Sequence, residues 1–198
     1  MPLVLGTDKK RLSKRHAATN LEEYREEGYL DSAIINTLAR LGWSKGDEEV
    51  FYLDDLIENF NIEEVQKAGA IFDITKLDWV NSQHLANLSI DDFKSHLKPF
   101  LKKIDIEMED HSNLDLMINA MRSSENTLSG IAESLIPYFK DISSYDENAI
   151  NKFLSDGSDI LANIKDVLLK IDDWNENNID TVLKTFQTNN DLPVPKVN

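Results

Sequence analysis

The sequence predicts a mainly α protein, in which a bundle or cage of helices follows a short N-terminal strand and loop. Apolar residues recur at the spacing of amphipathic helices through most of the chain, and loops rich in Asn, Asp and Ser separate these stretches. A run that favours a strand occurs near the start. With 198 residues, of which 41% are hydrophobic, the chain can bury a real core.

The first segment is expected to form a strand at Leu3–Leu5, which a glycine ends, and then a polar basic loop that extends to Arg15. A capping box follows the loop, with Thr19 or Asn20 as the first residue and a glutamate three positions later. This pattern predicts a helix that continues through Glu27.

The next helix is expected to begin at Asp31 or Ser32, since either side chain can cap its first turn. It is expected to end at Gly42, in the left-handed conformation that glycine tolerates. The later stretches with helical spacing of apolar residues are 53–60, 74–87, 89–104, 112–122, 127–139, 147–155, 159–171 and 175–188.

One division of the chain is expected, between residues 1–67 and residues 68–198. The short stretch Lys67-Ala68-Gly69-Ala70 separates a mixed N-terminal segment from the helical remainder there. The last residues, 192–198, contain two prolines and cannot be helical throughout. We therefore expect the helical region to be truncated at its C-terminal end.

The composition excludes several classes of protein. The chain has no cysteine, which excludes disulfide scaffolds and thiolate-bound zinc and suits a reducing cytoplasm. No apolar run reaches the roughly 18 residues that a membrane helix needs, so no membrane partner is expected. The net charge of −15 argues against a general nucleic-acid binder, but the first 20 residues carry +4 and the remaining 178 carry −19. A polyanion is therefore expected to meet the basic N-terminal end first.

The stretch Arg11-Leu12-Ser13-Lys14-Arg15 is the candidate for chemistry. A strand followed by a basic loop with one serine suits phosphate binding, because lysine is a compact cation and the serine hydroxyl and loop amides can donate hydrogen bonds. The alternative, taken from these five residues alone, is a solvated basic loop.

Residues 2–18, with the pattern P-L-V-L-G-x-D-x-x-R-L-S-K-R-H-A-A, resemble the K-M-S-K-S region of the glutamyl-tRNA synthetases. That region is usually written P-L-I-L-x-x-D-x-x-K-L-S-K-R-H-G-A. Three further stretches match the same family in the same order, and they are L-A-R-L-G-W-S at 38–44, D-D-L-I-E-N-F at 54–60 and I-F-D-I-T-K-L-D-W-V-N at 71–81. Beyond about residue 90 the likeness is one of helical pattern.

The resemblance implies a class I synthetase that activates glutamate with ATP and transfers it to the terminal ribose of tRNA(Glu). Residues 1–67 would carry the loop that contains residues 11–15, called the motif loop from here on, and the stem-contact region. Residues 68–198 would carry the helices that bind the anticodon. Lys14 would be the catalytic residue, and Mg²⁺ but no zinc would accompany ATP. The ATP-binding residues implied are Arg11, Ser13, Lys14 and Arg15. A cytoplasmic monomer is expected.

Two departures from the family pattern occur in the loop, where Arg11 replaces the usual lysine and Ala17 the usual glycine. A larger difference is an absence. Members of the class also need an H-x-G-H type motif, and no two of the four histidines lie at that spacing. This chain alone is therefore expected to be inactive, without the glutamate site and most of the ATP site.

Most of the other residues in the matched stretches are expected to pack in the core, and these are Leu41, Gly42, Trp43, Phe72, Leu77 and Trp79. Two roles stay open for Lys76, Asp78 and Asn81, which either meet the tRNA stem or lie on the solvated surface. The group Glu107, Glu109, Asp110 and His111 is expected to be an acidic loop, because no second histidine lies nearby to complete a metal site.

Residues 122–128, R-S-S-E-N-T-L, resemble the family stretch R-x-R-x-x-T-L. Arg122 and Ser124 would contact tRNA. Members that accept only tRNA(Glu) carry an arginine at the position of Ser124, where it reads the third anticodon base. That base is C in tRNA(Glu) and G in tRNA(Gln). A serine at this position imposes little penalty on G, so tRNA(Gln) is a second expected partner. The alternative is that Ser124 only caps a helix.

A second function stays open, that of a helical protein-interaction module derived from a synthetase tail. The acidic charge favours it, and so does the scarcity of arginine after Arg40, where only Arg122 remains. The four ordered matches favour the synthetase, because an interaction module has no need of a Leu-Ser-Lys-Arg loop.

Overall fold

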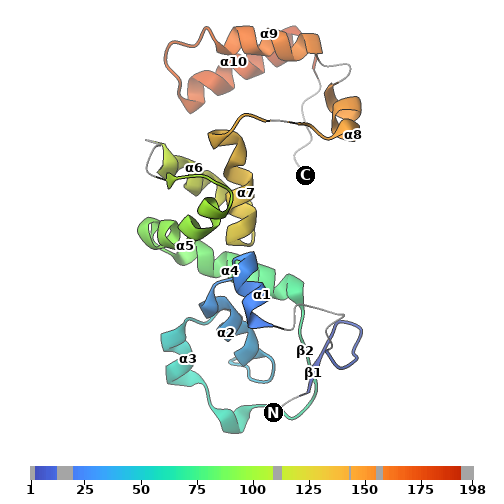
Figure 1. Ribbon diagram of the computed structural model, residues 1–198, viewed down its shortest axis with the longest axis vertical. Coiled ribbons are helices and arrows are strands. Elements are labelled where there is room, and N and C mark those ends of the chain that lie inside the picture. Colours follow the sequence, from blue (N-terminus) through green and yellow to red (C-terminus); the bar gives the residue numbers. More distant parts are fainter. Residues whose placement is uncertain (1–2, 13–19, 109–112, 143, 155–157, 193–198) are drawn as a thin grey trace. The chain divides into compact units, whose positions relative to one another are not determined.

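The computed structural model describes residues 3–12, 20–108, 113–142, 144–154 and 158–192 (Figure 1). The chain divides into two compact units, residues 1–141 and 142–198. The division expected between residues 67 and 68 lies inside the first unit and stays a prediction. Helices dominate the described residues, which confirms the expectation of a mainly α fold.

A short parallel sheet joins the start of the chain to a segment far along it. Strand β1, Val4–Leu5, pairs with strand β2, Ala70–Ile71, and Val4 lies opposite Ala70. The strand expected at the N-terminus is thus confirmed, while its partner lies in the stretch that the sequence suggested only as a boundary. The pairing holds the basic N-terminal segment against the residues that lead into α4.

Three helices and one 3₁₀ turn lie between the strands, and they are α1 (Leu21–Glu27), α2 (Asp31–Arg40), α3 (Leu53–Asn59) and η1 (Ile62–Glu64). Helix α1 begins as expected, because the side chain of Asn20 accepts a hydrogen bond from the backbone N–H of Glu22. Helix α2 begins at Asp31, but the cap expected from Asp31 or Ser32 is absent, because Leu30 occupies the N-cap position and no side chain bonds there.

The glycine that ends a helix in the left-handed conformation is not the expected one. Gly42 was expected to do so, but α2 ends at Arg40, and Leu41, which follows it, is in the right-handed helical region. Gly28 instead closes α1 with a φ of 92°, and its N–H donates to the carbonyl of Arg25. The chain also passes close to Gly28, where an added Cβ atom would lie 2.7 Å from the nitrogen of Leu128.

The main core lies among four helices of the first unit, α4 (Ile74–Asn87), α5 (Ile90–Lys103), α6 (Leu114–Met121) and α7 (Leu128–Phe139). Helix α4 has the bounds expected, and Asp73 caps it by accepting from the N–H of Thr75. Ser89 caps α5 in the same way through the N–H of Asp92. Buried side chains recur on one face of α5, at Phe93, Leu97 and Leu101.

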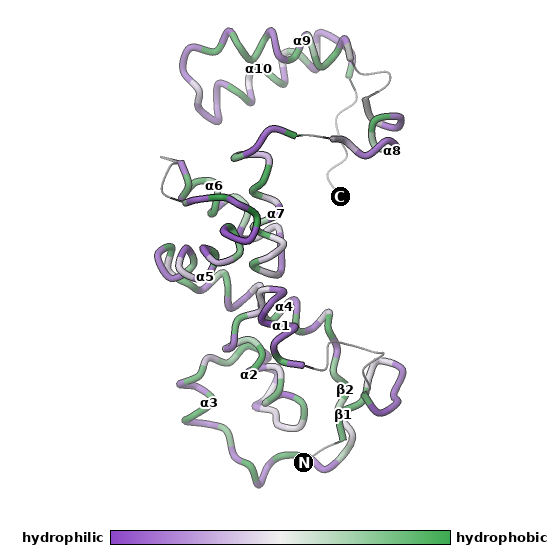
Figure 2. The backbone as a smooth tube through the Cα atoms, in the orientation of Figure 1, coloured by the Kyte–Doolittle hydropathy of each residue, from purple (hydrophilic) through white to green (hydrophobic). Residues whose placement is uncertain are grey.

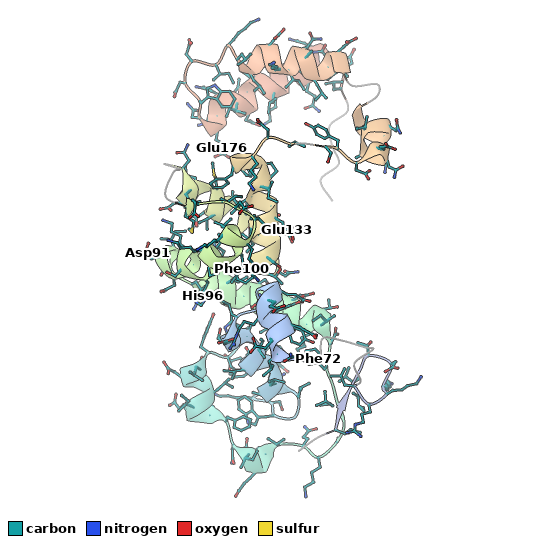
Figure 3. All side chains as sticks on the ribbon, in the orientation of Figure 1. Phe72, Asp91, His96, Phe100, Glu133 and Glu176 are labelled. Carbon is teal, nitrogen blue, oxygen red and sulfur yellow. The ribbon has the colours of Figure 1, made fainter. Side chains whose placement is uncertain are left out.

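Two smaller clusters stabilise the region near the sheet. One joins Tyr24, Tyr29, Ile34 and Leu77, with Phe72 packed against it. The rings of Phe72, labelled in Figure 3, and Tyr24 have centroids 5.9 Å apart. The other cluster joins Trp43, Phe51 and Leu56. Core positions for Trp43 and Leu77 are thereby confirmed.

Trp79 was expected in the core, but 46% of its surface is exposed. The buried residues of α4 are Leu77, Val80, Asn81, His84 and Leu85. Successive residues of a helix are about 100° apart, so this stripe turns position 79 toward solvent. The aromatic character of Trp79 suggested burial, and the helical phase overrides it.

The second unit contains α8 (Glu147–Ala149), the π-helical turn η3 (Ile150–Leu154), α9 (Ser158–Leu168) and α10 (Glu176–Asn189). Helices α9 and α10 pack on each other. Figure 2 shows hydrophobic and hydrophilic stretches alternating along α9. No helix within the described residues combines the length and apolar character that crossing a bilayer requires.

Candidate functional site

The N-terminal segment folds back on itself just before the motif loop. Leu5 and Arg11 form an antiparallel bridge, and the N–H of Leu12 donates to the carbonyl of Val4 at 3.0 Å. Lys9 makes the tight turn with a φ of 61°. Arg11 therefore lies on a short hairpin with its side chain exposed. The other residues of the predicted ATP-binding set, Ser13, Lys14 and Arg15, lie outside the described residues.

An ion-pair network holds α2, α4 and the loop between α2 and α3 together. The Nη2 atom of Arg40 lies 3.0 Å, and the Nζ atom of Lys76 2.7 Å, from the same carboxylate oxygen of Glu49. Partial burial acts to raise the pKa of Glu49, but the hydrogen bonds and charges of Lys76 and Arg40 outweigh it and lower that pKa. Lys76 is thus engaged within the protein, with 44% of its side chain exposed.

A buried polar network lies beside these charges. The Oδ1 atom of Asn36 accepts from the backbone N–H of Phe51 at 2.7 Å and from Nε2 of His84 at 3.1 Å. That oxygen can only accept, so the proton of His84 is on Nε2. Burial lowers the pKa of His84, which favours the neutral ring. The network fixes the extended segment before α3 against α2 and α4.

The two other polar residues for which stem contact was considered also have partners inside the protein. The hydroxyl of Tyr29 donates to the carboxylate of Asp78. Asn81 is fully buried, and its side-chain oxygen accepts from the N–H of Leu30 at 2.8 Å. Its nitrogen donates to the carbonyl of Asn126 at 2.6 Å. The idea that Asn81 lies on the solvated surface is wrong.

Arg122 lies at the end of α6 and is held by the end of α4. Its Nη2 atom donates to the carbonyls of Leu85, Ala86 and Leu88 at 2.6, 2.9 and 3.0 Å. The guanidinium carbon lies 4.9 Å from the centroid of the Phe93 ring. Carbonyls at the end of a helix lack partners within it and carry partial negative charge, so a cation is favourable there. No local pattern predicts this contact, because its partners lie more than 30 residues earlier in the chain.

Ser124 is exposed, two residues further along the same loop. Its hydroxyl donates to the carbonyl of Met121 at 2.7 Å, which closes the end of α6. Thr127, not Ser124, caps the next helix, because its hydroxyl accepts from the N–H of Gly130. The loop from Arg122 to Thr127 is thus held by α4, α6 and α7, with Ser124 on its exposed side.

The predicted site residues occupy two separate places in the first unit. Arg11 lies beside β1, while Arg122 and Ser124 lie where α6 ends. Figure 1 shows β1 and α6 toward opposite ends of this unit. Within the described ranges, no three histidine or carboxylate side chains gather as metal ligands.

Two family models match the chain, one after the other. The first, described as the catalytic domain of class I tRNA synthetases (E and Q), matches residues 1–79. The second, described as an anticodon binding domain, matches residues 92–198. The first match ends within α4, at residue 79, and the second begins within α5, at residue 92.

Curated proteins and solved structures agree with these models. Glutamate--tRNA ligase 1 of Syntrophus aciditrophicus is 38% identical over 187 residues, which cover 94% of this chain and 40% of that protein. The ligase of Geobacter sulfurreducens is 36% identical over the same shares of the two chains. A crystal structure of a glutamate tRNA ligase from Elizabethkingia meningosepticum, in complex with its amino acid, has a TM-score of 0.76 at 27% identity and covers 96% of this chain. The chain spans about 40% of the length of these relatives.

Proposed function

Because this chain belongs to the class I tRNA synthetases of the glutamate and glutamine group, we propose that it is part of a glutamate–tRNA ligase. It supplies the loop that contacts ATP and the helices that bind the tRNA stem and anticodon. The observation that carries the proposal is the order of the matches, with a synthetase catalytic model over residues 1–79 and an anticodon-binding model over residues 92–198. The alternative of a protein-interaction module has no comparable support.

The reaction has two steps. A carboxylate oxygen of glutamate first bonds to the α-phosphorus of ATP, and the bond from that phosphorus to the pyrophosphate oxygen breaks. The terminal ribose hydroxyl of tRNA then attacks the activated carbonyl and releases AMP. Mg²⁺ neutralises phosphate charge when it accompanies ATP, and no side chain of the described residues is assigned to it.

Lys14 acts in the first step. Negative charge grows on the pyrophosphate as it leaves, and an ammonium held beside it stabilises the transition state more than bound ATP. Ser13, Arg15 and Arg11 hold the triphosphate through hydrogen bonds and charge. The hairpin at Arg11 fits this role, because its backbone hydrogen bonds fix the point from which the loop starts.

The tRNA contacts lie at the other end of the first unit. The exposed Ser124 contacts the anticodon, Arg122 contributes to this contact from the same loop, and tRNA(Glu) is the main partner. Ser124 leaves room for the third anticodon base of tRNA(Gln) as well. The three carbonyls around Arg122 support this placement, since they fix the loop that presents Ser124. The enzyme acts as a monomer in the cytoplasm.

A direct assay tests the proposal. The complete protein that contains this chain is incubated with tRNA(Glu), ATP and radiolabelled glutamate, and acid-precipitable label is counted. We expect glutamate to be attached, and glutamine supplied in its place to give no product. Attachment of a different amino acid, or none with active tRNA, contradicts the proposal.

A further inference from the structure

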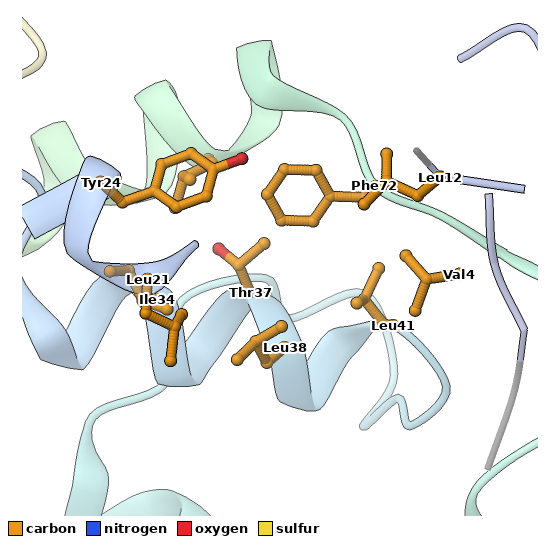
Figure 4. Close-up of a pocket in the computed structure, with 10 residues that line it drawn as sticks. Val4, Leu12, Leu21, Tyr24, Ile34, Thr37, Leu38, Leu41 and Phe72 are labelled. Carbon is orange, nitrogen blue, oxygen red and sulfur yellow. The ribbon is translucent and has the colours of Figure 1, made fainter. Parts of the chain in front are cut away.

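A cavity of about 190 Å³ lies beside the hairpin that leads to the motif loop (Figure 4). Three segments far apart in the sequence form it, namely the N-terminal hairpin, helices α1 and α2, and the residues from β2 into α4. The wall is mostly apolar, and it includes Val4, Leu12, Ile34 and Phe72. No charged side chain lines the cavity among the described residues.

Two hydroxyl groups interrupt this apolar wall. Tyr24 and Thr37 have only 6% and 7% of their surfaces exposed. Neither hydroxyl has a hydrogen-bond partner among the described residues. Figure 4 shows both oxygens directed into the space bordered by Phe72. A buried hydroxyl without a partner costs free energy, so a bound group that hydrogen-bonds to it is stabilised.

We propose that the cavity binds a small neutral molecule with a body the size of one aromatic ring and an oxygen that accepts hydrogen bonds from Tyr24 and Thr37. The volume supports this size, because an apolar cavity of about 150 Å³ holds benzene. The described side chains of the wall carry no charge that could offset the desolvation of an ionic ligand, so they favour a neutral one. This proposal does not rest on the proposed aminoacylation function.

Two side chains at the rim of the cavity are exposed. Leu21 and Leu38 both line it, and 59% and 46% of their surfaces are exposed. A bound ring also contacts Val4 and Leu12, which are joined by the backbone hydrogen bond of the hairpin. Occupancy therefore braces the segment that immediately precedes Ser13.

The test compares phenol with toluene, which have nearly the same shape but differ in the hydroxyl. Binding of each to the 198-residue chain is measured by titration in ¹H–¹⁵N correlation spectra. The variants Tyr24→Phe and Thr37→Val, singly and together, remove the protein hydroxyls with little change of shape. We expect the ratio of phenol to toluene affinity to fall about tenfold in the double variant, since each lost hydrogen bond is worth a few-fold in affinity.

Two controls locate the site. Leu38→Phe adds volume at the rim and should weaken both ligands at least about tenfold by filling the space. Leu53→Phe adds the same volume on α3, where Leu53 is 53% exposed and outside the cavity, and should leave both affinities unchanged. Either single hydroxyl variant suffices if the double variant does not fold.

Three results overturn the proposal. If neither ligand shifts the signals of cavity residues at millimolar concentration, the cavity holds only water. If the phenol preference survives loss of both hydroxyls, these groups do not recognise the ligand. If Leu38→Phe binds both ligands as the unaltered chain does, the ligands bind elsewhere.

Discussion

The carbonyl of Gly28 accepts a hydrogen bond from the backbone N–H of Leu128 at 3.2 Å, which joins the end of α1 to the start of α7. The hydroxyl of Ser129 adds a second bond to the carbonyl of Glu27 at 2.6 Å. Helix α1, which follows the motif loop in the sequence, is thus bonded to α7, which follows the loop with Ser124. This joint requires a glycine for two reasons, the backbone conformation and the close approach.

Replacing Gly28 with alanine tests the joint. An added Cβ would lie 2.7 Å from the nitrogen of Leu128, and the φ of 92° is strained for any side chain. We expect Gly28→Ala to lower the free energy of unfolding by about 3 kcal/mol, measured by urea denaturation. Gly46→Ala is the matched control, because Gly46 also has a positive φ, of 58°, but nothing lies within 4 Å of its Cβ position. It should cost about 1 kcal/mol, and equal losses in the two variants would mean that the close contact is absent.

The buried ring of His84 predicts a dependence of stability on pH. Its pKa in the folded protein is lowered from 6.5, so the unfolded chain binds the proton first. The stability that His84 contributes is present above that value and is lost as pH falls through it toward the lowered pKa. Unfolding in urea is compared at about pH 7.5 and about pH 5.5. His84→Gln can still donate to Asn36 but does not titrate, so its stability should fall less; an identical fall would assign the effect to other groups.

Much of the fold follows from local signals that the sequence carries. The helical spacing of apolar residues predicts where α4 and α5 begin, and in the structure Asp73 and Ser89 cap these helices through bonds to residues two or three positions away. The left-handed glycine and the exposure of Trp79 were missed. Both depend on what the segment packs against, which local patterns do not specify.

The candidate site residues likewise include some that the sequence predicts and some contacts that only tertiary packing determines. The resemblance identified the motif loop and the loop at Arg122. It did not show that the guanidinium of Arg122 bonds to three carbonyls at the end of α4, more than 30 residues earlier. Asn81 likewise looked like a surface residue, and it instead bonds to segments 51 and 45 residues away. Such contacts follow from tertiary packing, and no spacing within the sequence announces them.

Lys14→Ala in the complete enzyme tests the role of the motif loop. We expect glutamate-dependent exchange of pyrophosphate into ATP to slow by on the order of 10² to 10³, while tRNA affinity stays nearly unchanged, because the lysine acts on charge that appears in the transition state. Lys10→Ala is the control, since Lys10 pairs with Asp8 on the hairpin. Equal losses in exchange and in tRNA affinity would make Lys14 only a positioning contact.

Ser124 sets the expected tRNA specificity. With serine at this position, the complete enzyme should attach glutamate to tRNA(Glu) and tRNA(Gln) with similar kcat/KM. Ser124→Arg should selectively lower the value for tRNA(Gln), because a fixed arginine leaves the wrong base clashing or unpaired. Discrimination of 100-fold or more by the unaltered enzyme, about 2.7 kcal/mol, would rule out this role.

Footprinting on tRNA is the most direct test of whether this chain carries the stem and anticodon contacts of a glutamate–tRNA ligase. The 198-residue chain is added to end-labelled tRNA(Glu), and backbone cleavage is mapped at low salt, where phosphate contacts are strongest. We predict protection of the anticodon loop and of the adjoining stem, with the anticodon protection reduced in Arg122→Ala. Cleavage that is unchanged along the whole tRNA, or protection equal to that of an unrelated tRNA, would contradict the claim.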